Sequence, residues 1–170
     1  MADRGIYNVL FLCACNSARS VLAETLINHR GKGRFTGYCA GSFPKGAVHP
    51  LALDLLAKAH LDTSRLRSKS WDEFARPGGP VMDFVFAVGD QAAGEVRPVW
   101  PGNPVTAHWG VPDPAAVCGM EAEQRRALRD AYVALENRIK LFVTLPIDKL
   151  DRVAIKRQVD EIGHLRAVPK

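Results

Sequence analysis

The sequence predicts an α/β fold, a single domain in which a four-stranded parallel sheet carries helices on both faces. Short apolar runs of strand length alternate with longer segments of helical spacing along the 170 residues. The runs are apolar at nearly every position, as expected of strands that are buried on both faces of a parallel sheet. With 47% hydrophobic residues, the chain can fill one core of ordinary size.

Four apolar runs are predicted to be the strands: Ile6–Leu12, Phe35–Cys39, Phe84–Val88 and Val105–Ala107. Helical patterns are predicted over three intervening or following segments: Ser20–Arg30, Pro50–Ala59 and Glu121–Thr144. Gly31 ends the first helix, and the turn at 76–80 is expected to be exposed.

The long helix over 121–144 is amphipathic. Its apolar residues recur at spacings of three and four: Leu128, Tyr132, Leu135, Ile139 and Phe142. We interpret this stripe as core packing, not as a partner site, and expect the arginines of the helix to face water.

A further helix is predicted from Asp148 to Ile162, with Pro146 and Asp148 near its start. We therefore divide the chain into residues 1–145 and a C-terminal helical extension of the same domain, 146–170. The extension either covers the sheet or pairs with a second subunit, so a monomer and a dimer both remain open.

Charge and composition limit the partners. The net charge is +5, but basic residues are mixed with acidic ones, as where Arg125 and Arg126 follow Glu121 and Glu123. The sequence has no stripe of interleaved aromatic and basic residues, so nucleic-acid binding is not expected. We expect a mild attraction for small anions.

No apolar stretch approaches the roughly 20 residues of a membrane span, so neither a membrane segment nor a leader is expected. The four cysteines, at 13, 15, 39 and 118, have neither a zinc-site spacing nor the density of a secreted disulfide scaffold. We expect reduced thiols, no metal site and a cytoplasmic location.

The segment from Cys13 to Ser20 joins the first apolar run to the first helix. Five residues separate Cys13 from Arg19, so the loop can curl around a tetrahedral anion, with its N–H groups and the helix dipole pointing inward and a guanidinium closing the ring. The same field favours thiolate over thiol, which makes Cys13 the expected nucleophile. The alternative is that Cys13 is a small buried residue at a strand end. The expected substrate-binding residues are Ala14, Cys15, Asn16, Ser17, Ala18 and Ser20.

Two residues of this loop have further expected roles. Ser20 can donate a hydrogen bond to the sulfur, or act as a plain helix N-cap, and the two roles are compatible. Asn16 can hold the strained turn of the loop through its side-chain amide.

Here the chain resembles the low-molecular-weight protein tyrosine phosphatases and the arsenate reductases that share their fold, over about residues 5–145. A second motif, from His108 to Pro114, is similar to the late loop of that family. The resemblance implies that Asp113, in the Asp-Pro pair, is the general acid.

The resemblance implies attack by the Cys13 thiolate on the central atom of a bound oxyanion. Tyrosine phosphatases of the family usually have aromatic residues after the Asp-Pro pair, but here Ala115 and Ala116 follow it. The lead-in of His108 and Trp109 also resembles the arsenate reductase branch. These features favour arsenate as substrate. The alternative is a phosphatase that hydrolyses tyrosine phosphate esters through a cysteinyl-phosphate.

Thioredoxin-coupled arsenate reductases of this fold carry two relay cysteines after the third strand. The corresponding segment, 86–98, has no cysteine, and Val88 and Arg97 align with the relay places. Cys15 and Ala18 also depart from the usual loop, which often has glycine or histidine at the first place and cysteine at the second.

Three outcomes follow for the thiol-arsenate adduct. In the first, which we favour, an external thiol resolves the adduct. That thiol is expected to be glutathione or a glutaredoxin-like protein rather than thioredoxin. Alternatively Cys15 resolves Cys13 through a strained and easily reduced ring. In the third outcome, only slow phosphatase activity or anion binding remains. Cys39 and Cys118 are expected to be structural, and no bound cofactor is expected.

Some relatives hold potassium beside the anion loop. Asn16 and Glu24 match the residues that bind it, but Cys39 stands at a serine place and Lys69 at an aspartate place. A lysine ammonium would supply the cation's charge, so we expect no dependence on potassium.

An enzyme is favoured over a binding module that senses the oxyanion without turnover. Such a module would be expected to lose Cys13, Arg19 or Asp113, and the chain has all of them.

Overall fold

The computed structural model describes residues 5–89, 98–117 and 119–165. Two predictions therefore lie outside the described residues, the alignment of Arg97 with a relay place and the structural role of Cys118.

The fold class is confirmed. The strands β1 (Tyr7–Leu12), β2 (Phe35–Ala40), β3 (Phe84–Ala87) and β4 (Val105–His108) form a four-stranded sheet in the order β2-β1-β3-β4. Each neighbouring pair is parallel. In the central strand, Phe11 lies opposite Cys39 on one side and Phe86 on the other. The carboxyl ends of the strands therefore share one edge, where ligands bind in open parallel sheets.

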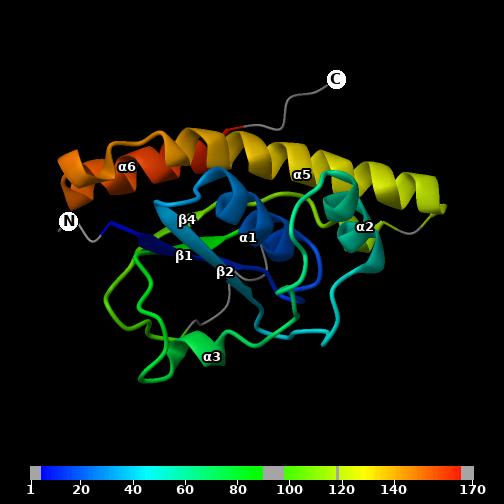
Figure 1. Ribbon diagram of the computed structural model, residues 1–170, viewed down its shortest axis with the longest axis horizontal. Helices are drawn as coiled ribbons and strands as arrows, with labels where there is room; N and C mark the ends of the chain where they lie inside the picture. The colour runs from blue at the N-terminus through cyan, green and yellow to red at the C-terminus, as the bar shows by residue number, and fades with distance from the viewer. Residues whose placement is uncertain (1–4, 90–97, 118, 166–170) are drawn as a thin grey trace.

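Alternate residues of β1 serve two different cores. Val9 and Phe11 belong to the larger core, under α1 (Arg19–Arg30) and α5 (Glu121–Val143). Leu10 and Leu12 belong to a smaller core on the opposite face. Figure 1 shows α5 and α6 along one side of the sheet and α3 on the other. The connection from β2 to β3 supplies both α2 (Pro50–Lys58) and α3 (Asp72–Ala75).

The short helix α3 was not predicted. Its four residues are too few for a hydrophobic period. Phe74 anchors it, packing with Trp71 and Trp100 in the smaller core. These aromatic residues cover the strands on this face of the sheet, whereas the other face is covered by the long helices α1 and α5.

The predicted terminal helix is present, but its predicted start at Asp148 was wrong. The segment forms a short 3-10 turn (Ile147–Lys149) and then α6 (Arg152–Gly163). Asp151 separates them because its carboxylate accepts a hydrogen bond from the Ala154 N–H at 2.7 Å, which caps α6. The helix lies against β4, where the Trp109 indole donates to the Val159 carbonyl at 2.9 Å. Within the chain the extension therefore covers the β4 side of the sheet, and pairing with a second subunit stays an open prediction.

The expectation that the arginines of α5 face water was wrong for Arg138. Its side chain is buried, 5% exposed, and donates hydrogen bonds to the carbonyls of Trp109 at 2.8 Å, Gly110 at 2.9 Å and Leu165 at 2.9 Å. Burial lowers the pKa of this guanidinium from its usual range. Hydrogen bonds to the three carbonyls replace the water that the group loses.

Among the described residues, no helix is both long enough and apolar enough to cross a membrane.

Candidate active site

The loop from Cys13 to Ala18 connects β1 to α1 at the carboxyl edge of the sheet. Asn16 has a φ of 47°, in the left-handed region, which turns the chain back on itself. The residue at the N-cap of α1 is Ala18, and no side chain caps the helix. The alternative of Ser20 as an N-cap is therefore wrong, because Ser20 lies inside the helix. The N-terminal N–H groups of α1 remain available to a ligand.

The loop is held from outside by its carbonyl groups. Three of them accept hydrogen bonds from the segment after β2: Ala14 from Phe43 at 2.9 Å, Cys15 from Lys45 at 3.0 Å and Ser17 from His49 at 2.8 Å. Within the described residues, no acceptor meets the loop's own N–H groups from 14 to 18. With the carbonyls turned outward and the N–H groups unused, the loop, 13–18, forms a cradle of donors of the kind that can hold an anion.

The thiol of Cys13 lies at the base of this cradle and is buried, 2% exposed. Its sulfur is 2.9 Å from the hydroxyl oxygen of Ser20. That oxygen already accepts a hydrogen bond from the Asn16 side-chain amide at 2.7 Å. Because the amide can only donate there, the Ser20 proton is free to point at the sulfur, to which the hydroxyl can donate.

Arg19 and Asp113 come together across the cradle. The guanidinium of Arg19 is 3.6 Å from the Asp113 carboxylate and donates to the Val111 carbonyl at 3.2 Å. The side chain of Arg19 is 11% exposed and that of Asp113 36%, so both are accessible to a small ligand. The structure therefore brings Cys13, Arg19, Ser20 and Asp113 into one site.

Gly89 is a site residue that the sequence analysis missed. A Cβ atom added there would lie 2.9 Å from a terminal nitrogen of Arg19 and 3.0 Å from its central carbon. The absence of a side chain at this strand end thus makes room for the guanidinium. The glycine itself is visible in the sequence, but its neighbour in space is not.

A second buried cluster lies behind the loop. The ammonium of Lys69 is 3.4 Å from the Cys39 sulfur, 3.9 Å from the Glu24 carboxylate and 3.0 Å from the Arg67 carbonyl. The Lys69 backbone N–H donates to the Asn16 side-chain oxygen at 2.7 Å, which connects the cluster to the loop. Burial raises the pKa of Glu24, opposed chiefly by Lys69, and burial raises that of the Cys39 thiol well above its usual range.

These residues do not fit a potassium ion. The amide oxygen of Asn16 is engaged by a backbone N–H, Cys39 offers a protonated thiol, and the Lys69 ammonium already pairs with Glu24. Lys69 is therefore an internal cation in the place expected for the ion. Elsewhere in the part of the chain that the structure describes, no group of three or more His, Cys, Asp or Glu residues could hold a metal.

An exposed aromatic residue lies beside the cradle. Phe43, 69% exposed, is tied to the loop by its N–H bond to the Ala14 carbonyl. This aromatic residue follows β2 and was not predicted to lie at the site, because the expected position for one was directly after the Asp-Pro pair.

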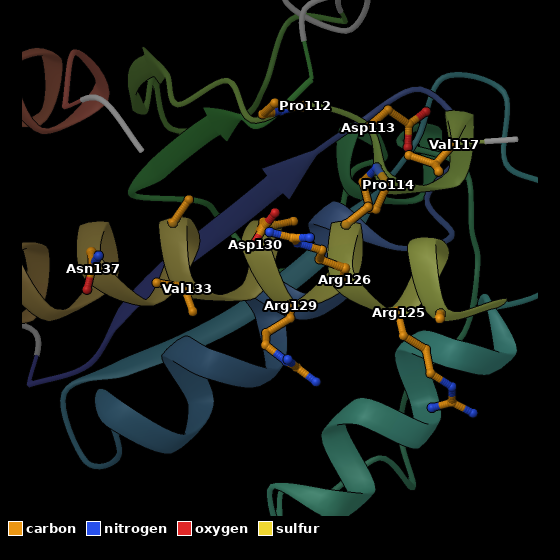
Figure 2. A pocket seen from close by; sticks show the side chains of 14 residues that line it. Pro112, Asp113, Pro114, Val117, Arg125, Arg126, Arg129, Asp130, Val133 and Asn137 are labelled. Carbon is orange, nitrogen blue, oxygen red and sulfur yellow. The ribbon is translucent and has the colours of Figure 1, made fainter. Parts of the chain in front are cut away.

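A hollow of about 960 Å³ adjoins the site without including Cys13. Figure 2 shows Asp113, Pro114 and Val117 on one side of it and α5, with Arg126 and Asp130, on the other. Of Cys13, Arg19, Ser20 and Asp113, only Asp113 lines this hollow.

The other thiol of the loop, Cys15, is half-buried and free. Val88, at one of the two relay places, is fully buried at the end of β3.

The comparisons agree with this geometry. Residues 8–156 match the low molecular weight phosphotyrosine protein phosphatase family. The chain belongs to that family. No match was found among curated proteins.

Solved structures with the same fold include arsenate reductases and protein tyrosine phosphatases. An arsenate reductase from Archaeoglobus fulgidus is 26% identical, with a TM-score of 0.60 over 78% of this chain and 98% of that one. A low molecular weight protein tyrosine phosphatase from T. tengcongensis is 22% identical, with a TM-score of 0.61 over 79% and 95%.

A third structure is a thioredoxin-dependent arsenate reductase from Corynebacterium glutamicum, 22% identical, with a TM-score of 0.59 over 82% of this chain. The match spans only 61% of the length of that protein.

Proposed function

We propose that this protein is an arsenate reductase that uses an external thiol. The observation that carries the proposal is the placing of the Cys13 sulfur, with Ser20 beside it, at the base of a small cradle that Arg19 closes. A compact tetrahedral oxyanion matches the donors of this cradle.

In the first step, the Cys13 thiolate attacks arsenic and a sulfur–arsenic bond forms. One arsenate oxygen leaves as water, with a proton from Asp113, while Arg19 and the loop N–H groups hold the remaining oxygens. The distance of 3.6 Å between the Arg19 guanidinium and the Asp113 carboxylate supports this division of roles, because both side chains can reach one small ligand.

In the second step, an external thiolate attacks the Cys13 sulfur. The sulfur–arsenic bond breaks and its electron pair passes to arsenic, which leaves as arsenite, while Cys13 becomes a mixed disulfide with the external thiol. A second thiol then reduces this disulfide. We assign the attack to glutathione or a glutaredoxin-like protein because the relay place at Val88 holds a buried apolar side chain. Resolution by Cys15 is the competing route, through a strained ring.

Hydrolysis of aryl phosphates is the second candidate function. It shares the Cys13 attack, but water then hydrolyses a cysteinyl-phosphate. The exposed ring of Phe43, attached to the cradle through Ala14, favours this candidate because it offers an apolar face to a substrate ring.

Arsenite production tests the proposal. Purified protein receives arsenate with either glutathione and glutaredoxin or thioredoxin and its reductase, with Cys13→Ser as the control. Arsenite that depends on Cys13 and forms with the glutathione system supports a reductase with an external resolving thiol. No arsenite with either system, together with Cys13-dependent hydrolysis of an aryl phosphate, would move the assignment to the phosphatase.

A further inference from the structure

The loop that carries Asp113 is held at its base by a buried arginine. Arg138 lies on α5 and directs one terminal nitrogen to the carbonyls of Trp109 and Gly110, the first two residues after β4. The other terminal nitrogen reaches the Leu165 carbonyl beyond α6. One planar guanidinium thus joins α5, the C-terminal extension and the loop of residues 109–113, here called the acid loop.

Helix α6 holds the same loop from another direction. The Trp109 indole, fully buried, donates to the Val159 carbonyl of α6 at 2.9 Å. At Gly163 the helix lies so close that an added Cβ would be 2.3 Å from the His108 carbonyl oxygen. The strand end and the start of the loop are therefore fixed between the sheet and α6.

The next residues connect this base to the chemistry. Val111 donates its N–H to the Val88 carbonyl at 3.0 Å and accepts a hydrogen bond from Arg19 at 3.2 Å. Asp113 then lies 3.6 Å from Arg19. Consecutive carbonyls at 109, 110 and 111 are thus held by two arginines, Arg138 from behind and Arg19 from the site.

We infer that Arg138, with α6 behind it, is a positioning residue that sets the acid loop, and that the C-terminal extension is thereby part of the machinery that delivers the proton of Asp113. The inference rests on the proposed function in that it takes Asp113 as the general acid. Its structural part, the fixing of residues 109–113, stands on the contacts alone.

The chemistry of Arg138 supports a role beyond filling space. Burying a guanidinium is costly, and among the described residues no carboxylate pairs with it. A hydrophobic side chain of similar volume would avoid that cost. What such a side chain cannot do is donate to carbonyls on two segments at once, which is the task that the geometry gives to Arg138.

Two measurements on the full-length chain test this inference. The first is hydrogen exchange of the backbone amides within residues 108–113, where every residue but Pro112 has an N–H, in Arg138→Met. The comparison is Arg129→Met, which changes an exposed arginine on the same helix. The second is turnover of two aryl phosphates, one with a good leaving group and one with a poor leaving group. A misplaced acid slows the poor leaving group more, because that group needs the proton.

We expect faster exchange at 108–113 in Arg138→Met and no change in Arg129→Met. We also expect turnover of the poor leaving group to fall on the order of ten-fold more than that of the good one, as a part of the roughly 10²–10⁴-fold effect of a general acid. Arg138→Lys should restore little, since one ammonium cannot serve both segments. If Arg138→Met does not fold, Trp109→Phe, which removes the indole donor, should show the same pattern more weakly.

Unchanged exchange at 108–113 would overturn the inference. The inference would also fail if Asp113→Asn slowed the poor leaving group more than the good one but Arg138→Met slowed both equally. Arg138 would then be merely structural. If Asp113→Asn itself fails to discriminate, the proposed role of Asp113 is wrong, and the exchange measurement alone decides whether Arg138 fixes the loop.

Discussion

Replacing Lys69 by methionine tests the account of the cluster behind the anion loop. The substitution keeps an unbranched side chain of nearly the same length but removes its charge. It leaves the Glu24 carboxylate, 8% exposed, without its cation and also removes the hydrogen bond to the Arg67 carbonyl.

The structure gives the size of the effect. At 3.9 Å the attraction between the two charges is about 4 kcal/mol for an effective dielectric constant of about 20. Removing one partner of a buried pair typically costs about 3–5 kcal/mol, since the other charge stays buried and unpaired. We therefore expect Lys69→Met to lower the free energy of unfolding at pH 7 by about 3–5 kcal/mol.

The loss should depend on pH. Burial already raises the pKa of Glu24, and removing Lys69, which opposes that shift, raises it further. A carboxyl whose pKa is higher in the folded chain than in the unfolded chain stabilises the fold below the unfolded pKa, and this stability is lost as the pH rises through the folded pKa. The deficit of Lys69→Met should therefore be smaller at pH 5 than at pH 7.

Urea denaturation followed by tryptophan fluorescence measures these quantities. Lys58→Met is the matched control, because Lys58 is exposed and pairs with Asp54 at the surface, and it should leave the midpoint unchanged. Adding Glu24→Gln to Lys69→Met should recover part of the stability. A Lys69→Met protein as stable as the wild type at pH 7, or a deficit that does not vary with pH, would refute the reasoning.

The remaining predictions concern the loop, its neighbours and potassium. Ser20→Ala should lower single-turnover rates about 10- to 100-fold, the worth of one hydrogen bond to a charged sulfur, and an effect limited to KM would argue against that bond. Gly89→Ala should crowd the Arg19 guanidinium and weaken competitive inhibition by inorganic phosphate several-fold, with an unchanged urea midpoint; undiminished inhibition would show that the guanidinium does not need this space. The melting temperature should be the same in potassium and sodium buffers, and a clear rise with potassium would contradict the interpretation of Lys69 as an internal cation.

The sheet was predictable from the sequence because each strand is a short apolar run that is buried on both faces. Each predicted strand agrees with the observed one at one end and differs from it by a single residue at the other. The terminal helix was predicted with the wrong start, since Asp148 and Asp151 both look like helix caps and only the placement of the Ala154 N–H distinguishes them.

The anion loop was predictable because its chemistry is local. Cys13, Arg19 and Ser20 lie within one turn of chain and one turn of helix, so their spacing alone indicates their proximity. The residues that surround this loop and the loop of Asp113 come from far along the sequence, and no pattern within the anion loop indicates them. Gly89, Lys69 and Arg138 are examples, and the helical period even assigned Arg138 to the solvent face.

A single turnover with arsenate and glutathione, followed by mass spectrometry of the intact protein, tests the central claim most directly. The account predicts stoichiometric arsenite and a Cys13 mixed disulfide, seen as the mass of one glutathione less two hydrogens and absent in Cys13→Ser. A loss of two hydrogens with a Cys13–Cys15 disulfide, or no change in mass and no arsenite, would contradict it.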